Sequence, residues 1–293
     1  MTLGLEIRDA AVTAVAVDAA GRVVARAEQP LENDPATGAG RALAAVAAGA
    51  GEAADVGIAI DPPPSDAAAM DERLVAGLAP RRVRATAVPG TAAAMAEAWT
   101  GAARGAGDVI YFGVADHVAA GVLRGGVPAT GAHGHALAIA WMSLNPVERE
   151  DYRRVGCHEA EVGGAGIVRR LVWRVKAGDP SRVEDLVGGD LTAISVEHVL
   201  AAARDRDGVS ISVVRDTAKY LGMAAANLLL FADPEVLVLG GLMASAADLL
   251  LEPVRVELAR RVPAALAESV TVVAATLGAD APAIGAARLA SLA

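Results

Sequence analysis

The sequence is poor in several residue types, and each shortage excludes something. Cys157 is the single cysteine in 293 residues, so the chain cannot form a disulfide with itself, and we expect a reducing, cytoplasmic location. Apolar residues make up 54%, yet no apolar run approaches the roughly 18 residues that a membrane-spanning helix needs. The longest candidate, residues 223–232, also contains Asn227. We therefore expect no membrane partner.

Basic clusters are also missing. The net charge is −9, and lysine and arginine gather nowhere into a patch, so we expect no nucleic-acid partner that binds through its phosphates. The amino terminus lacks the charged and then apolar pattern of a secretory signal. The length allows one large domain or two smaller ones, each with enough residues for a core.

The central feature is the uninterrupted apolar stretch at residues 236–239, which predicts a buried parallel strand. Gly240 and Gly241 end this strand, and Ser245 is expected to cap the following helix. Paired glycines let a ligand approach the backbone closely, which makes them candidate nucleotide contacts. A tight turn required by the fold explains them equally well.

Alternating apolar residues predict further strands and hairpins. Residues 2–28 are expected to form a hairpin start, and residues 109–114 and 118–123 form a second hairpin closed by Asp116 and His117. Short strands are expected at 56–60, 83–88 and 270–275. The repeated arrangement predicts an α/β fold of duplicated mixed-sheet units, with a ligand cleft between the two.

Helices are expected between these strands. Thr91 is expected to cap the helix 92–103, and Pro253 to kink or split the helix that begins near residue 245. The other helices are predicted at residues 38–54, 166–176, 195–205, 210–232 and 281–292.

Several motifs together resemble the ROK family of repressors, uncharacterised reading frames and sugar kinases, a branch of the two-domain actin-like (hexokinase-like, ribonuclease H-like) ATPase fold. They are residues 96–104, Gly125-Gly126 with 131–136, 233–241 with 250–253, and 277–286. The resemblance implies a first domain at 1–105 completed by a helix at 279–293, a second domain at 106–278, and a homodimer. It also implies sugar between the domains and ATP mainly on the second. Because residue 2 already begins the first strand, no amino-terminal helix-turn-helix is expected.

The chain departs from the kinase motifs that this resemblance implies. Family kinases open with D-x-G-G-T, where this chain has Glu6 followed by Arg8 and Asp9 at the glycine positions. Residues 115–119 replace the second phosphate loop, G-T-G-x-G, and bring in the carboxylate of Asp116. Ungapped alignment puts residues 88–91, ending in Thr91, on the N-D-A-N motif, so Pro89 replaces the catalytic base.

The sugar-binding and zinc-binding motifs differ as well. Residues 138–141, ending in Trp141, replace E-x-G-H. Glu150 and Tyr152 stand where the first two zinc cysteines would be, and only Gly156-Cys157 is retained. One thiolate without Cys or His partners is not a structural zinc site, so no metal is expected.

Four of the five histidines, His117, His133, His135 and His158, fall in the segment that lines the family's cleft, together with Trp141, Cys157 and Glu159. One interpretation is a repurposed active site, with Asp116 and His117 as an acid–base pair, or His133 and His135 as ligands. The other is a set of solvated loop residues. The predicted cleft comprises Glu6, Arg8, Asp9, Thr91, His133, His135 and Trp141.

Three functions stay open from the sequence. The first is a kinase-dead relative that binds a small, sugar-like ligand or has a regulatory role, with no cofactor. The second is an enzyme with new acid–base chemistry in the cleft, such as one of specialised metabolism. The third is an unusual sugar kinase that keeps ATP and Mg²⁺ and recruits another carboxylate, such as Asp61 or Asp9.

Overall fold

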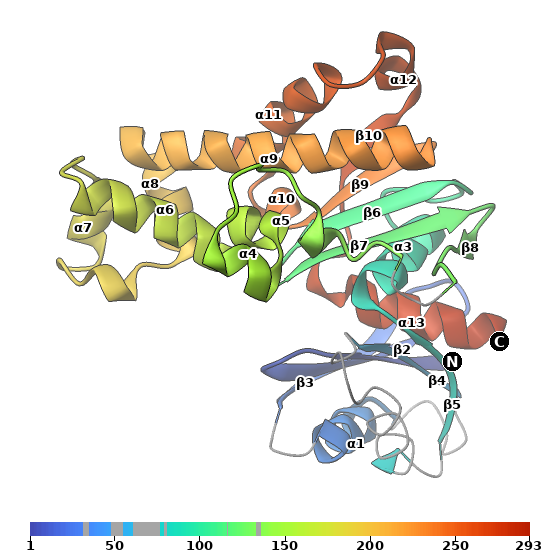
Figure 1. The fold of residues 1–293 in the computed structure, drawn as a ribbon. Coiled ribbons are helices and arrows are strands. Elements are labelled where there is room, and N and C mark those ends of the chain that lie inside the picture. The colour runs from blue at the N-terminus through green and yellow to red at the C-terminus, as the bar shows by residue number, and fades with distance from the viewer. Residues whose placement is uncertain (32–34, 48–54, 61–76, 79–80, 116, 133–135) are drawn as a thin grey trace. The chain divides into compact units, whose positions relative to one another are not determined.

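The computed structural model describes residues 1–31, 35–47, 55–60, 77–78, 81–115, 117–132 and 136–293. The chain divides into two compact units (Figure 1). Unit 1 contains residues 1–111, 120–136 and 275–293, and unit 2 contains residues 112–119 and 137–274. The boundaries predicted for the two domains stay a prediction.

Unit 1 contains a five-stranded mixed sheet in the order β3-β2-β1-β4-β5. β1 is antiparallel to β2 and parallel to β4, so that Leu5 pairs with Ala14 on one side and with Ile58 on the other. The central β1 is buried almost throughout, whereas β3 at the edge alternates between exposed and half-buried residues. The five strands are Thr2–Ile7, Ala11–Val17, Val23–Pro30, Asp55–Ile60 and Arg82–Ala87.

Helices cover both faces of this sheet. α1 (Pro35–Val46) contacts β2 and β3, and α13 (Ala281–Leu292) contacts β1 and β4. α13 lies so close to the sheet that a Cβ at Gly57 would meet the carbonyl oxygen of Ala286 at 1.8 Å. α3 (Pro89–Thr100) packs on α13, where Gly285 faces the backbone of Ala92 just as closely. Small residues therefore set the distance between helices and sheet.

The second sheet repeats the topology of the first. Its order is β10-β9-β6-β7-β8. If β6 to β10 are counted as strands one to five, the order read from β8 is 3-2-1-4-5, the same as in the first sheet. β7 and β8 are antiparallel, and β9 and β10 are parallel. These strands are Val109–Val114 (β6), Val118–Arg124 (β7), Val127–Pro128 (β8), Val236–Gly241 (β9) and Thr271–Ala274 (β10). The duplicated α/β units predicted from the sequence are confirmed.

Unit 2 is rich in helices, and α9 (Gly208–Ala232) is the longest of those described. α9 contacts α5, α6, α8 and α11, and its buried face includes Leu221, Ala225 and Leu229. The remaining helices are α4 (Glu150–Val155), α5 (Cys157–Val162), α6 (Gly164–Lys176), α7 (Arg182–Leu186), α8 (Val196–Arg204), α10 (Leu242–Ser245), α11 (Ala247–Ala259) and α12 (Ala264–Ser269). Short 3₁₀ turns lie at Ile139–Trp141 (η2), Leu191–Ala193 (η3) and Gly278–Asp280 (η4).

Two expectations about helix caps are wrong. Thr91 does not cap α3, because the helix begins at Pro89 and Val88 is its N-cap. Proline favours the first helical position, where its fixed φ fits and its missing N–H costs nothing. Ser245 is the last residue of α10 and caps no helix. Pro253 lies inside α11 and does not split it. The break between these helices falls at Ala246, whose φ of −116° leaves the helical region.

No helix in the described part of the chain is long and apolar enough to cross a membrane.

Candidate functional site

The turn after β1 is held by the guanidinium of Arg8. Its Nε lies 3.7 Å from the carboxylate of the buried Glu6, and its Nη2 donates to Glu28 at 3.0 Å and to Thr13 at 3.2 Å. Thr13 and Glu28 belong to β2 and β3, so one side chain joins all three antiparallel strands. Hydrogen bonds from Arg26 and the nearby charge of Arg8 lower the pKa of Glu28. The cation of Arg8 is thus already engaged by two carboxylates.

The same turn does without glycine. The amide of Arg8 donates to the carbonyl of Ala11 at 2.9 Å, and Asp9 is exposed at the tip. Among the described residues, Leu137, Arg206 and Asp233 are the non-glycine residues with positive φ, and none of them lies in this turn. The backbone of this turn therefore has a conformation that residues with side chains can adopt, and it does not require glycine.

The first turn of α3 packs directly on β7. A Cβ at Gly90 would lie 2.3 Å from the carbonyl oxygen of Ala120, so no larger residue fits there. Thr91 is buried and lines a cavity of about 370 Å³ in unit 1, together with Met95, residues of β5 and the carboxyl terminus. Pro89 opens the helix and offers no group that accepts a proton.

Glu97, further along α3, holds two loops together. This fully buried carboxylate accepts hydrogen bonds from the amides of Ala102, Thr276 and Leu277 at 2.6, 3.0 and 3.0 Å. The hydroxyl of Thr276 adds a fourth at 3.2 Å. Because backbone donors compensate its charge, Glu97 has a structural role.

In unit 2, His117 pairs with Glu159. Its Nδ1 lies 3.0 Å from Oε1 of Glu159, whose Oε2 accepts from the amide of Val118 at 3.1 Å. Glu159 is mostly buried on α5, whereas half of the imidazole of His117 is exposed. A carboxylate that orients a partly exposed imidazole can support general acid–base chemistry. The predicted partner of His117, Asp116, lies outside the described residues.

His158, the neighbour of Glu159, lies in the core. It is completely buried, its Nδ1 lies 3.1 Å from the carbonyl oxygen of Ile139, and its ring stacks at a tilt 5.5 Å from Phe112. Desolvation lowers the pKa of His158 to about 4, so the imidazole is neutral at pH 7. His158 therefore packs as a core residue.

Trp141 ends the 3₁₀ turn η2 and is 58% exposed. The segment is anchored by other residues: Ile139 is buried, and Gly156 approaches the carbonyl of Ala140 so closely that a Cβ would lie 2.2 Å away. The indole of Trp141 is consequently available for stacking. Cys157 is buried against Tyr152 and Ala160.

Gly240 and Gly241 close β9. Gly241 has a φ of 58°, and a Cβ there would lie 1.9 Å from the carbonyl oxygen of Val114 in β6. Packing between neighbouring strands therefore requires Gly241 whether or not a nucleotide binds.

The structure brings some of the predicted residues together within a unit. Glu6 and Arg8 are in contact, Asp9 is exposed beside them, and Thr91 belongs to the same unit. His117, Trp141, Gly240 and Gly241 belong to the other unit. His133 and His135, like Asp116, lie outside the described residues. No group of three or more His, Cys, Asp or Glu that could hold a metal is found in the described ranges.

Sequence reasoning missed the partners in these contacts. Glu28 lies 20 residues from Arg8 in the sequence, and Glu159 lies 42 residues from His117. For Glu159, the available signal was its place beside His158 in the histidine-rich segment.

The duplicated sheets define the class of this protein as the actin-like ATPase fold of the sugar kinases. The ROK family glucokinase of Streptomyces griseus, solved with glucose and AMPPNP, superposes with a TM-score of 0.81 over 100% of this chain and 99% of its own, at 24% identity.

The family model described as "ROK family" matches residues 88–292, and the chain belongs to the ROK family. A glucokinase of Halalkalibacterium halodurans is 30% identical over 195 residues, which is 66% of this chain and 59% of the relative. An N-acetylglucosamine repressor of Escherichia coli is 26% identical over 54% of this chain and 38% of its own length. The chain thus spans less than two thirds of the curated relatives it matches.

Proposed function

We propose that this ROK-family protein binds a small, sugar-like ligand as a binding or regulatory protein and does not transfer phosphate. The observation that carries this proposal is the contact of Arg8 with Glu6 and Glu28 in the turn after β1. The resemblance to ROK-family kinases implies that glycines and an acidic residue at this turn would hold metal and phosphate.

The Arg8 network does not suit that task. A Mg²⁺ ion at Glu6 would have to displace or repel a guanidinium that lies 3.7 Å away. The side chains of Arg8 and Asp9 also keep a phosphate from the backbone amides of the turn. These residues therefore do not fit an ATP–Mg²⁺ complex held in the manner of the family.

Two further positions support the proposal. Pro89 stands where the kinase base is expected, and proline has no side-chain proton acceptor. At the expected zinc loop, Tyr152 packs against the buried Cys157, and its hydroxyl donates to Glu161, so these residues do not fit a tetrahedral metal.

Titration calorimetry with millimolar ATP–Mg²⁺, together with a coupled assay for ADP formation with glucose, tests this function. We expect neither heat nor turnover. The matched variant is Arg8→Gly combined with Asp9→Gly, which restores the glycines and should permit measurable nucleotide binding. Phosphorylation of any aldose by the unmodified protein at an ordinary rate would overturn the proposal.

A second candidate function is carried by the contact between His117 and Glu159. In this case the protein is an enzyme that uses the imidazole as an acid–base group on a sugar-like substrate. Proton NMR of aldoses incubated with the protein in D₂O would reveal exchange or conversion, and His117→Ala should abolish it. Unchanged spectra across the sugars would exclude this function.

We also propose a homodimer, on the basis of family membership. Light scattering after size exclusion, at several protein concentrations, gives the mass in solution.

A further inference from the structure

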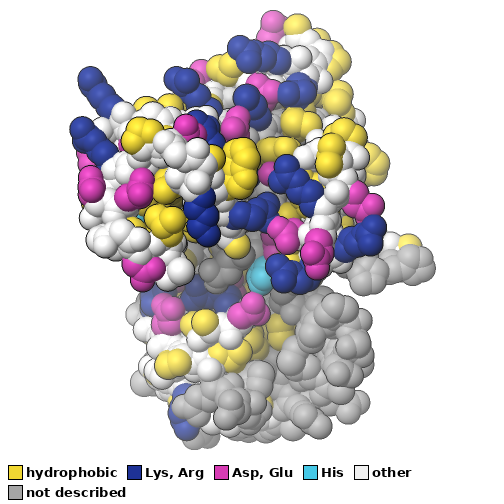
Figure 2. Space-filling model, turned by 60° about the vertical axis from the view of Figure 1, so that its left-hand side comes forward, with side chains coloured by type: hydrophobic (Ala, Val, Ile, Leu, Met, Phe, Trp, Pro, Cys, Tyr) yellow, Lys and Arg dark blue, Asp and Glu magenta, His cyan; other side chains and the backbone are white. Residues whose placement is uncertain are grey.

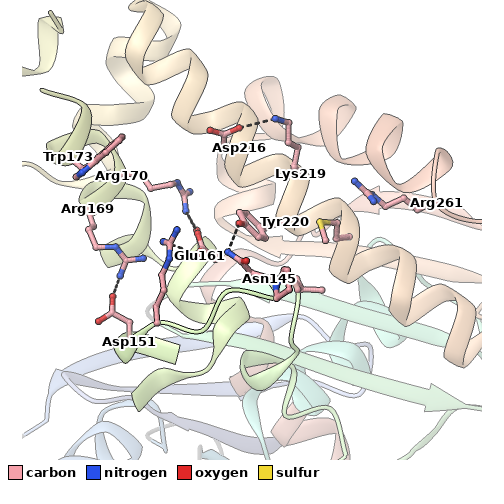
Figure 3. A pocket seen from close by; sticks show the side chains of 14 residues that line it. Asn145, Asp151, Glu161, Arg169, Arg170, Trp173, Asp216, Lys219, Tyr220 and Arg261 are labelled. Atoms are coloured by element: carbon pink, nitrogen blue, oxygen red, sulfur yellow. Dashed lines mark hydrogen bonds and ion pairs between the residues drawn. The ribbon is translucent and has the colours of Figure 1, made fainter. Parts of the chain in front are cut away.

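Unit 2 contains a second cavity, and none of the predicted site residues that the structure describes lines it. Its volume is about 970 Å³, at the upper end of what a small-molecule site occupies. α9 contributes Asp216, Lys219, Tyr220 and Met223, whose spacing of three and four residues puts them on one helix face. Arg169, Arg170 and Trp173 come from α6 (Figure 3).

Cations outnumber carboxylates in this lining. Four arginines and one lysine face three carboxylates, an excess of two positive charges within a chain whose net charge is −9. On the face shown in Figure 2, basic and acidic side chains are interspersed. The charged lining residues are Arg149, Arg169, Arg170, Lys219, Arg261, Asp151, Glu161 and Asp216.

The most deeply buried carboxylate of the lining accepts hydrogen bonds from three neighbouring side chains. Glu161 is 1% exposed and accepts from the hydroxyl of Tyr152, from Arg149 at 3.3 Å and from Arg170 at 3.1 Å. Burial and the charge of Glu161 raise the pKa of Tyr152, so its hydroxyl stays protonated as a donor. Glu161 thus organises the cations, and its charge is compensated from within.

The outer cations keep part of their surface in solvent. The side chain of Arg149 is 49% exposed, and that of Lys219 is 61% exposed beside Asp216 at 3.0 Å. Both side chains can reorient toward a ligand at low cost, since exposed ion pairs contribute little. The buried Nε of Arg170 has no acceptor among the described residues.

Apart from the amide of Asn145, the uncharged lining is apolar or aromatic. Trp173 is 69% exposed, and Leu144, Pro146 and Met223 add apolar surface beside the ring of Tyr220. An exposed indole beside a cationic cavity is suited to a ring that carries an anion.

We propose that this cavity is a binding site for a small organic dianion of the aryl or nucleoside phosphate class. The dianion complements the excess of cations in the lining, of which Arg261 already pairs with Glu257. Its phosphate lies at Arg149 and Lys219 and its ring against Trp173. The inference does not rest on the proposed function, because every residue that it uses lies in unit 2.

The lysine content of the chain gives a direct test. Lys176 and Lys219 are the only lysines, both are exposed, and Lys176 does not line the cavity. Acylation of the full chain by acetic anhydride, followed by peptide mass spectrometry, measures both at once. We expect phenyl phosphate to slow acylation of Lys219 about threefold or more at saturation and to leave Lys176 unchanged.

Matched variants separate the cavity from general ionic effects. Arg149→Gln should weaken phenyl phosphate binding about tenfold or more, as measured by the concentration that protects Lys219. Arg153→Gln, an exposed residue of α4 that pairs with Glu148 outside the lining, should leave it unchanged. Because Arg149 also supports Glu161, Trp173→Ala serves as a second variant, and it should lower affinity for phenyl phosphate more than for inorganic phosphate.

Three outcomes would overturn the proposal. One is equal protection of Lys176 and Lys219, and another is protection by inorganic phosphate at the same concentration as by phenyl phosphate. The third is a loss of Lys219 acylation that occurs without ligand and only at high protein concentration. It would mean that a second copy of the chain covers this face.

Discussion

At the scale of single residues, burial of a titratable group links stability to pH. The pKa of His158 is about 4 in the folded protein and 6.5 when unperturbed, because desolvation disfavours the cation. Between these values the unfolded chain binds the extra proton, so the folded state loses stability as the pH falls from above 6.5 toward 4. The loss should amount to roughly 2–3 kcal/mol.

Urea unfolding at pH 7.5 and pH 4.5 measures this loss. His158→Gln keeps a donor for the carbonyl of Ile139 but cannot be protonated, so its stability should change less between the two pH values. Equal pH dependence in His158→Gln and the unmodified protein would contradict the argument.

Glu97 offers a second test at this scale. Replacing its carboxylate with the amide in Glu97→Gln leaves an NH₂ group facing backbone donors, so we expect about 2–3 kcal/mol of destabilisation. Denaturant unfolding measures this, with Glu148→Gln as the control. Glu148 pairs with Arg153 on the surface, where both side chains are mostly exposed, and its replacement should cost far less than that of Glu97. Equal effects of the two substitutions would refute the structural role of Glu97.

At the scale of elements, alternation and apolar runs were enough to predict most of the described strands and helices. Helix ends were harder, because Thr91 and Ser245 are good capping residues that lie inside helices in this fold. The start of α3 is set by Pro89, and the break between α10 and α11 is set by the backbone at Ala246. Propensity is a weak guide wherever packing and a neighbouring proline decide the end of a helix.

The candidate site shows the same limit. The sequence predicted that Arg8 and Asp9 stand at glycine positions of the family motif. It did not predict that Arg8 would join three strands, because Glu28 reaches it only through the register of β2 and β3. The contact of His117 with Glu159 likewise depends on the packing of α5 beside the β6–β7 hairpin. Contacts between distant segments follow from tertiary structure and leave little trace in local patterns.

The close approach of α13 to the sheet gives the prediction at this scale. Gly57→Ala would put a methyl group 1.8 Å from the carbonyl oxygen of Ala286, so β4 and α13 would have to separate. We expect about 3 kcal/mol or more of destabilisation in a thermal or urea unfolding experiment. Gly208→Ala, at the start of α9, meets no atom within 4 Å and is the matched control. A Gly57→Ala protein as stable as this control would contradict the described packing.

At the scale of the whole molecule, the first unit is completed by the last residues of the chain. Residues 275–293 belong to unit 1, where α13 contacts β1, β4 and α3. The amides of Thr276 and Leu277 also supply two of the donors to Glu97. Unit 1 therefore cannot finish folding until residues 275–293 have been synthesised.

Removal of residues 275–293 should accordingly damage the two units unequally. Without α13, the sheet loses its cover on one face, and Glu97 keeps a buried charge with fewer donors, so unit 1 should lose its native packing. Unit 2 contains its own core around α9 and should retain it. Hydrogen exchange followed by mass spectrometry would then show lost protection in β1, β4 and α3, and retained protection in α9. Protection that falls to the same extent in both units would mean that they unfold as one cooperative body, and protection unchanged in β1 would mean that α13 is dispensable.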